Sequence, residues 1–124
     1  MISVGTKLHA SDNSGARVVQ CIKVFRGNSQ TPAKVGDTIL VSVQSVAAKH
    51  KGKAKPGQLF HAVVTASTKR IRRKDGSSLR FDKNAVVLLN SQGVPVGTRV
   101  LGVATHDLRR KGFVKVLTLA PYVL

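Results

Sequence analysis

Apolar and polar residues alternate along two segments in the middle of the chain. In residues 38–46, Ile39, Val41 and Val43 share one face of an extended chain, and polar serine and glutamine lie between them. This period of two is typical of a strand that is buried on one side. Residues 59–68 repeat the pattern, with one phase occupied by Phe60, Ala62, Val64 and Ala66. We therefore expect two half-buried strands here.

Three further segments have the composition of strands. Residues 18–25 are rich in β-branched side chains, and residues 85–89 form a continuous apolar run, which fits a strand buried on both faces. Residues 98–103 give a weaker signal. Glycine-containing turns separate these segments, so the pattern predicts five or six short strands in a small closed barrel. No repeat or linker divides the sequence, and its 124 residues fit a single domain, residues 1–124.

Two connections between the expected strands are densely cationic. The first, residues 47–58, carries lysines at alternate positions: Lys49, Lys51, Lys53 and Lys55. The second, residues 68–81, turns at Asp75-Gly76, which is a strong turn dipeptide. Its two arms carry six cations: Lys69, Arg70, Arg72, Arg73, Lys74 and Arg80. Because this much positive charge does not fit in a core, the second hairpin must lie on the barrel or project from it.

The C-terminal residues 104–124 change to a helical pattern. Thr105 is placed to cap a short helix through residues 107–110. A stripe with helical spacing follows, formed by Phe113, Val116, Leu117 and Ala120. Pro121 stops the pattern. Alternation within residues 114–118 is also compatible with a strand, but the spacing favours a helix, and we expect a short C-terminal helical part.

The charge balance limits the partner more than it limits the fold. There are 21 lysines and arginines against 5 acids, all of them aspartates, which gives a net charge of +16. Such a field calls for an acidic polymer or surface as partner. An ordinary solvated face would intersperse acids among the bases, so the sequence predicts binding to a polyanion. No apolar run approaches 18 residues, and the N-terminus lacks the apolar segment of a secretory signal. We therefore expect no membrane span.

Enzyme chemistry has little support in the sequence. The chain has no glutamate, and its four histidines stand at no metal-ligand spacing. Cys21 is the only cysteine and lies in an apolar segment, so we interpret it as a core residue rather than a nucleophile. A lone cysteine also fits a reducing compartment. A helix start explains His106 beside Asp107 better than a catalytic dyad does. We expect no catalytic residue, no metal and no cofactor.

The mode of nucleic-acid binding follows from the aromatic and basic residues. All five aromatic residues stand beside apolar neighbours and are predicted to be in the core: Phe25, Phe60, Phe81, Phe113 and Tyr122. Without exposed aromatics for base stacking, contacts should go to the phosphates and grooves of a folded RNA, which is then recognised by shape. The candidate rRNA-binding residues are Arg17, Lys23, Arg26, Lys49, Lys51, Lys53, Lys55, Lys69, Arg70, Arg72, Arg73, Lys74, Arg80, Arg109, Arg110 and Lys111.

Several motifs together resemble a known family. They are DNSGAR at residues 12–17, CIKV at 21–24, VGD at 35–37, RRKDGSSLRFDKNAVVLLN at 72–90, GTR at 97–99 and the ending KVLTLAPYVL. These motifs occur in order over nearly the whole chain. On this resemblance the chain is identified as a member of the family of ribosomal protein fourteen of the large subunit, in its bacterial and organellar branch.

The resemblance implies a mainly β fold, with a five-stranded barrel, a projecting β-ribbon and a short C-terminal helical part. It implies a structural role in the large ribosomal subunit, binding to large-subunit rRNA near the subunit interface, and a bridge to small-subunit rRNA. The implied protein neighbours are large-subunit proteins three and nineteen. The family also offers a docking surface for a ribosome-silencing factor, and the corresponding residues here are Thr98, Arg99 and Lys115.

The sequence departs from the pattern of that family in a strand that ends early at residues 62–65, in Lys74 where a proline often stands, and in its charge. The chain lacks glutamate altogether, including in residues 106–111, where the family usually mixes its charges. A net charge of +16 also exceeds what we expect of a bacterial member, which favours a mitochondrial ribosome over a bacterial cytoplasmic one.

Two other functions remain open on the sequence. The main alternative is a free RNA-binding β-barrel, either a translation factor or an RNA chaperone, which would expose aromatic side chains on one sheet. A peripheral membrane protein that docks through residues 49–55 is a third class. It lacks the amphipathic helix or lipid motif that stable anchoring needs.

Overall fold

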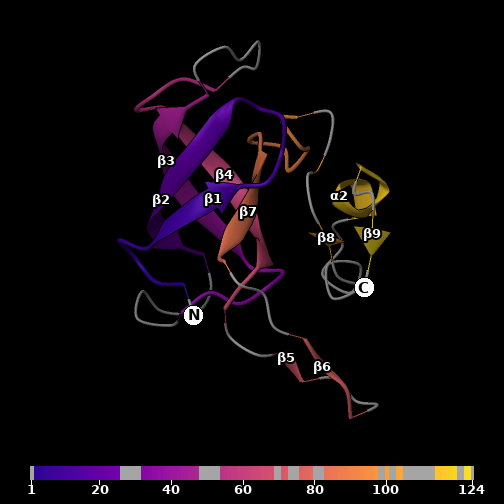
Figure 1. Cartoon of the computed structure of the whole chain (residues 1–124). Helices are drawn as coiled ribbons and strands as arrows, with labels where there is room; N and C mark the ends of the chain where they lie inside the picture. The colour runs from indigo at the N-terminus through magenta and orange to yellow at the C-terminus, as the bar shows by residue number, and fades with distance from the viewer. Residues whose placement is uncertain are drawn as a thin grey trace.

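The computed structural model describes residues 2–25, 32–47, 54–68, 71–72, 76–79, 83–97, 100, 103–104, 114–119 and 122–123. Short strands dominate these residues (Figure 1). In chain order, the elements are β1 (Lys7–Ala10), β2 (Ala16–Val24), β3 (Thr38–Val46), β4 (Leu59–Ala66), β5 (Ile71–Arg72), β6 (Ser78–Leu79), β7 (Ala85–Leu89), β8 (Val103–Ala104), α2 (Val114–Leu119) and β9 (Tyr122–Val123).

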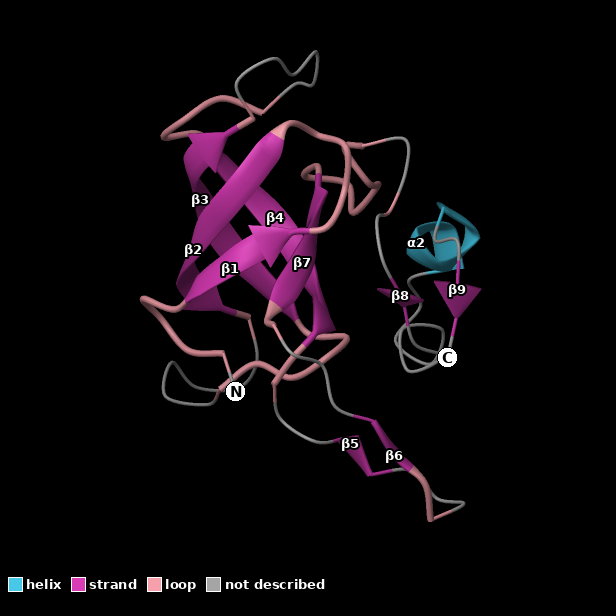
Figure 2. Cartoon of the chain, in the orientation of Figure 1, coloured by secondary structure: helices cyan, strands magenta, loops and turns pink. Residues whose placement is uncertain are grey.

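Five of the strands close into a barrel in the order β1-β2-β3-β4-β7. Neighbouring strands are antiparallel except at the closing seam, where β1 and β7 run parallel with His9 opposite Ala85. Figure 2 shows these strands wrapped around one another, with the helix outside them. Closure removes the open edges that would otherwise pair with other chains. The mainly β fold with a five-stranded closed barrel is confirmed.

The strand that completes the barrel is β1, which the hydrophobic pattern does not predict. Only one of its four residues, Leu8, is fully buried, so the segment is too short to carry a period of two. Of the weaker candidate segment 98–103, the structure describes only Val100 and Val103, and neither belongs to a barrel strand. Val100 makes a single bridge to Asp12, and Val103 begins β8 in a separate two-stranded sheet.

The barrel core consists of small aliphatic side chains. Ile39, Val41 and Val43 point inward from β3 and are at most 1% exposed, as the alternating pattern predicts. The apolar run of β7 is buried on both faces, also as predicted. The chain after β7 turns back and forms an antiparallel bridge with its last residue, Leu89. The backbone N–H of Val96 donates to the carbonyl of Leu88 at 3.0 Å. Each fully buried valine or leucine contributes about 1.5–3 kcal/mol.

β5 and β6 form a two-stranded ribbon that extends away from the barrel (Figure 1). Its ladder has two residue pairs, Ile71 opposite Leu79 and Arg72 opposite Ser78. Gly76 in the connecting turn has a φ of 88°, a backbone conformation that favours glycine. The predicted projecting hairpin is therefore confirmed.

The C-terminal part lies beside the barrel, with α2 next to the parallel pair β8–β9 (Figure 1). Val116 of α2 is 1% exposed and belongs to the core cluster. The backbone N–H of Val100 donates to the carbonyl of Leu119 at 3.3 Å. The helix prediction is confirmed over residues 114–119, and the helix predicted at 107–110 lies outside the described residues. Within the described ranges, no helix is long and apolar enough to cross a membrane.

Candidate nucleic-acid interface

The two aspartates in the described part of the chain are both turned inward. Asp12 is 5% exposed; its Oδ1 accepts hydrogen bonds from the N–H and the hydroxyl of Ser14 at 3.2 and 2.6 Å. Its Oδ2 accepts the backbone N–H of Leu88 at 3.0 Å, which ties the β1–β2 turn to β7. Asp37 is 8% exposed and accepts the backbone N–H of Lys34 at 2.8 Å. Both carboxylates therefore stabilise the fold instead of lowering the charge of the surface.

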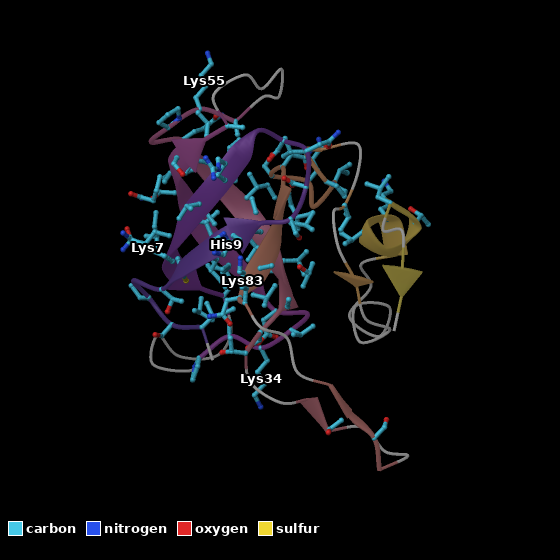
Figure 3. All side chains as sticks on the ribbon, viewed as in Figure 1. Lys7, His9, Lys34, Lys55 and Lys83 are labelled. Carbon is cyan, nitrogen blue, oxygen red and sulfur yellow. The ribbon has the colours of Figure 1, made fainter. Side chains whose placement is uncertain are left out.

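Because both described aspartates are buried, all the exposed charged side chains among the described residues are cations. Of the predicted rRNA-binding residues, Arg17 and Lys23 are exposed on β2, and Lys55 is exposed in the β3–β4 connection. Lys115, a predicted docking residue, is exposed on α2. Figure 3 shows Lys55 at one end of the barrel. Among the described residues, these cations therefore lie on three separate elements: β2, the β3–β4 connection and α2.

Three further exposed lysines belong to this surface and were not among the predicted binding residues. Lys7 lies on β1, Lys34 in the turn before β3, and Lys83 just before β7. Figure 3 shows Lys34 near the end of the barrel opposite Lys55. Each stands alone in the sequence, whereas the predictions followed clusters of basic residues. Recognising β1 as a strand would have found Lys7, because it alternates with the buried Leu8.

Phe25 corrects the prediction that all aromatic side chains are in the core. Its side chain is 45% exposed, whereas Phe60 is partly buried against the core cluster as expected. The Phe25 ring stacks on the imidazole of His61, with ring centroids 5.3 Å apart and planes 17° from parallel. The ammonium of Lys23 lies over the Phe25 ring, 5.4 Å from its centroid. We call these three residues, Lys23, Phe25 and His61, the stacking cluster.

A β-bulge explains why Phe25 is outside the barrel. The pairing of β2 with β3 shifts between Cys21 and Lys23. A bulge inserts one extra residue into a strand, and the residues after it change face. Cys21 and Val24 are therefore both buried, while Lys23 and Phe25 are exposed. Uninterrupted alternation from Cys21 would have turned Phe25 inward.

Cys21 is a buried core residue, as predicted, with 1% of its surface exposed. Burial raises the pKa of its thiol, and a hydrogen bond with the backbone of Lys23 lowers it by a smaller amount. The reactive thiolate is therefore scarce. Within the described residues, no three histidine, cysteine or acidic side chains come together as a metal site would require.

The comparison with known families decides what kind of protein carries this surface. A family model described as ribosomal protein L14p/L23e matches residues 1–124. The chain belongs to the ribosomal protein L14p/L23e family. Membership gives it a structural role in the large ribosomal subunit.

Two of the motifs that carried the resemblance meet in this L14p/L23e fold. A side chain added at Gly97 of the GTR motif would place its Cβ 2.6 Å from Oδ1 of Asn13, in the DNSGAR motif. The same Cβ would lie 3.3 Å from the backbone nitrogens of Asn13 and Ser14. Glycine therefore permits the two segments to pack at this distance. The GTR motif therefore needs glycine at residue 97 because of this close contact. The DNSGAR motif supplies Asp12, whose carboxylate bonds to Ser14 and Leu88.

The remaining predicted residues are not placed by the structure. The backbone of Arg72 is paired in β5, but its side chain is not described. The others lie outside the described residues: Arg26, Lys49, Lys51, Lys53, Lys69, Arg70, Arg73, Lys74, Arg80, Thr98, Arg99, Arg109, Arg110 and Lys111. Their binding roles stay predictions.

Proposed function

We propose that this L14p/L23e protein binds large-subunit rRNA near the subunit interface and contributes to a bridge with small-subunit rRNA. The observation that carries the proposal is the separation of charge. Within the described residues, Asp12 and Asp37 are buried, and all exposed charges are lysine or arginine. A surface of this kind attracts phosphates from several directions, which suits a protein embedded among RNA helices.

The proposed contacts go to phosphates, and recognition is mainly by shape. Each neutralised phosphate releases counterions. In a plot of log affinity against log salt concentration, each such contact makes the negative slope steeper by about 0.7–0.9. Lysines and arginines fix position and orientation without reading sequence. The projecting ribbon carries predicted RNA-binding cations that include Arg72 and Arg73. It would therefore add phosphate contacts at a distance from the barrel.

Sedimentation tests the proposal against a free RNA-binding β-barrel, the second candidate. The exposed ring of Phe25 favours that alternative, because such proteins display aromatic side chains for stacking. A structural constituent stays with the large particle in a salt gradient that removes exchangeable factors. If the chain washes off intact particles together with translation factors, the structural role is wrong.

We also propose that Thr98, Arg99 and Lys115 receive a ribosome-silencing factor, and that large-subunit proteins three and nineteen are neighbours. Lys115 is exposed on α2, and the hydrogen bond from Val100 to Leu119 holds the chain that follows Arg99 at the end of this helix. Arginine is a frequent central anchor in protein interfaces.

Arg99→Ala tests the docking proposal. It should weaken factor binding to assembled particles by about 2 kcal/mol, while large-subunit assembly stays normal. Lys7→Ala is the control, because Lys7 lies on β1 of the barrel and should leave factor binding unchanged. Loss of particle incorporation with normal factor binding would instead assign Arg99 to RNA.

A mitochondrial location is the last part of the proposal. It is supported by the absence of glutamate and by the net charge of +16. Cell fractionation of the native protein tests it directly. Co-sedimentation with mitochondrial ribosomes is expected, and recovery with bacterial or cytoplasmic ribosomes would contradict it.

A further inference from the structure

Three of the four large hydrophobic residues that are exposed in the described part of the chain belong to β2 and β4 or directly follow β2, and the fourth is Val4. Ile22 is 40% exposed and Leu59 is 55% exposed, in addition to Phe25. Strand pairing places Lys23 opposite Leu40, and Leu40 opposite His61. Lys23 and His61 of the stacking cluster therefore lie on β2 and β4, with β3 between them. Phe25 directly follows β2, and its backbone N–H donates to the carbonyl of Thr38 in β3 at 3.2 Å.

The geometry within the cluster suits a planar ligand with a negative charge. Phe25 and His61 are stacked and nearly parallel, at 17°, so the imidazole covers one face of the Phe25 ring and holds it in place. The ammonium of Lys23 lies 5.4 Å from the centre of the Phe25 ring. Lys23 is exposed and has a flexible stem, so it is the member of the cluster that can move when a ligand stacks. A nucleotide offers both a planar base and a phosphate next to it.

Charge favours RNA over a protein segment as the occupant. Within the described residues, no exposed carboxylate surrounds this face, because Asp12 and Asp37 are buried. Every described charge on the exterior attracts phosphate. A protein partner would have to be acidic as well as apolar here. Unpaired RNA bases commonly stack on aromatic side chains, with a neighbouring cation holding the backbone.

We propose that the stacking cluster binds one unpaired nucleotide of rRNA, with its base on the face of Phe25 that His61 leaves open and its phosphate on Lys23, which moves aside from the ring. This inference rests on the proposed rRNA binding and adds to it. The rest of the surface recognises RNA by shape, whereas this cluster distinguishes a flipped or bulged base from a paired one. It requires no particular base, because every base has a flat face.

The test compares two RNA hairpins that differ by one bulged nucleotide. The full-length chain is titrated with a fully paired hairpin and with the same hairpin carrying a bulged 2-aminopurine. Wild-type protein should prefer the bulged hairpin, and stacking should quench its fluorescence. Phe25→Ala should reduce that preference about tenfold, which corresponds to the usual contribution of one stacked base. Leu59→Ala is the matched control, because Leu59 is an exposed apolar residue of the same face.

A second variant, Phe25→Trp, tests stacking while it keeps an aromatic ring at residue 25. The chain contains no tryptophan, so Phe25→Trp introduces a unique fluorophore at the site. It should keep the preference for the bulged hairpin, and its fluorescence should be quenched only by that RNA. Lys23→Gln should weaken binding of the bulged hairpin and reduce the salt slope by about 0.7–0.9.

The outcomes separate this inference from the proposed function. Equal affinity for both hairpins, or an equal loss in Phe25→Ala and Leu59→Ala, overturns the nucleotide site while rRNA binding survives. No binding to either hairpin or to large-subunit rRNA overturns both. If the Phe25→Trp side chain becomes buried in assembled subunits but is not quenched, a protein covers this face and the inference is wrong.

Discussion

The barrel and the projecting ribbon are built from the same kind of element but depend on different partners. The barrel strands bury their side chains against one another, and Val63, Val64 and Leu88 have no exposed surface. The ribbon has a ladder of two residue pairs, and Gly76, Ser77 and Ser78 at its tip are exposed. A two-stranded ribbon alone is marginally stable in water. Apolar alternation thus predicts the barrel, whose side chains pack on one another, whereas dense positive charge predicts the ribbon, which we propose is stabilised by bound RNA.

The largest effect is expected in the barrel core. Leu88→Ala should lower the free energy of unfolding by about 2–5 kcal/mol, because Leu88 is fully buried and its truncation leaves a cavity. Leu59→Ala is the control, since Leu59 is 55% exposed and its loss should cost no more than about 0.5 kcal/mol. Urea denaturation monitored by circular dichroism measures both. Equal losses would show that the core of the barrel is not where its stability resides.

The next effect concerns the buried carboxylate that joins the first turn to β7. Asp12→Ala should destabilise the chain by about 2 kcal/mol, because it leaves the buried backbone N–H of Leu88 without its acceptor. Asp12→Asn removes the same charge but keeps an acceptor oxygen, so its loss should be smaller. Thermal unfolding of both variants makes the comparison. Equal destabilisation would assign the role of Asp12 to its charge instead of its hydrogen bonds.

A smaller effect is expected at Cys21. Cys21→Ala should lower the free energy of unfolding by about 1 kcal/mol, because only one buried sulfur atom is removed. Native protein should also react slowly with a thiol reagent, since burial raises the pKa of the thiol and covers it. Denatured protein provides the reference rate. Equally fast labelling of the native protein would contradict the buried position.

The smallest effect on stability is expected in the ribbon. Arg72→Gln should change the free energy of unfolding by less than about 0.5 kcal/mol, because the stability of the free chain resides in the barrel. Hydrogen exchange measures the same contrast residue by residue. Amides of β3 and β4 should be protected in the free chain, and those of β5 and β6 only when RNA is bound. Strong protection of β5 and β6 without RNA would remove the distinction between the two regions.

How much of the fold the sequence predicts depends on how many residues carry each signal. β3, β4 and β7 are long enough to show alternation or a continuous apolar run, and all three are found. β1 has four residues and one fully buried side chain, Leu8, so no periodic signal exists. It enters the barrel only because pairing with β2 and β7 closes the sheet, which is a long-range effect.

The candidate site was predicted less completely, for two physical reasons. The bulge after Cys21 changes the face of the residues that follow it, so Phe25, just past the end of β2, is exposed although it follows a mostly apolar segment. The contact of Phe25 with His61 joins residues on different strands and depends on barrel closure. Asp12 and Asp37 also bond to near neighbours in the chain, Ser14 and Lys34. The link from Asp12 to Leu88 in β7 joins distant segments, so no local pattern in the sequence indicates it.

The most direct test of the account is the salt dependence of rRNA binding by the ribbon. The affinity of the full-length chain for a large-subunit rRNA fragment is measured by filter binding over a range of salt concentrations. Replacing Arg72 and Arg73 together with Gln should flatten the log–log slope by about 1.4–1.8, since each lost phosphate contact removes about 0.7–0.9. The fold should be unchanged by circular dichroism. An unchanged slope in the folded double variant would contradict the claim that the ribbon binds rRNA phosphates.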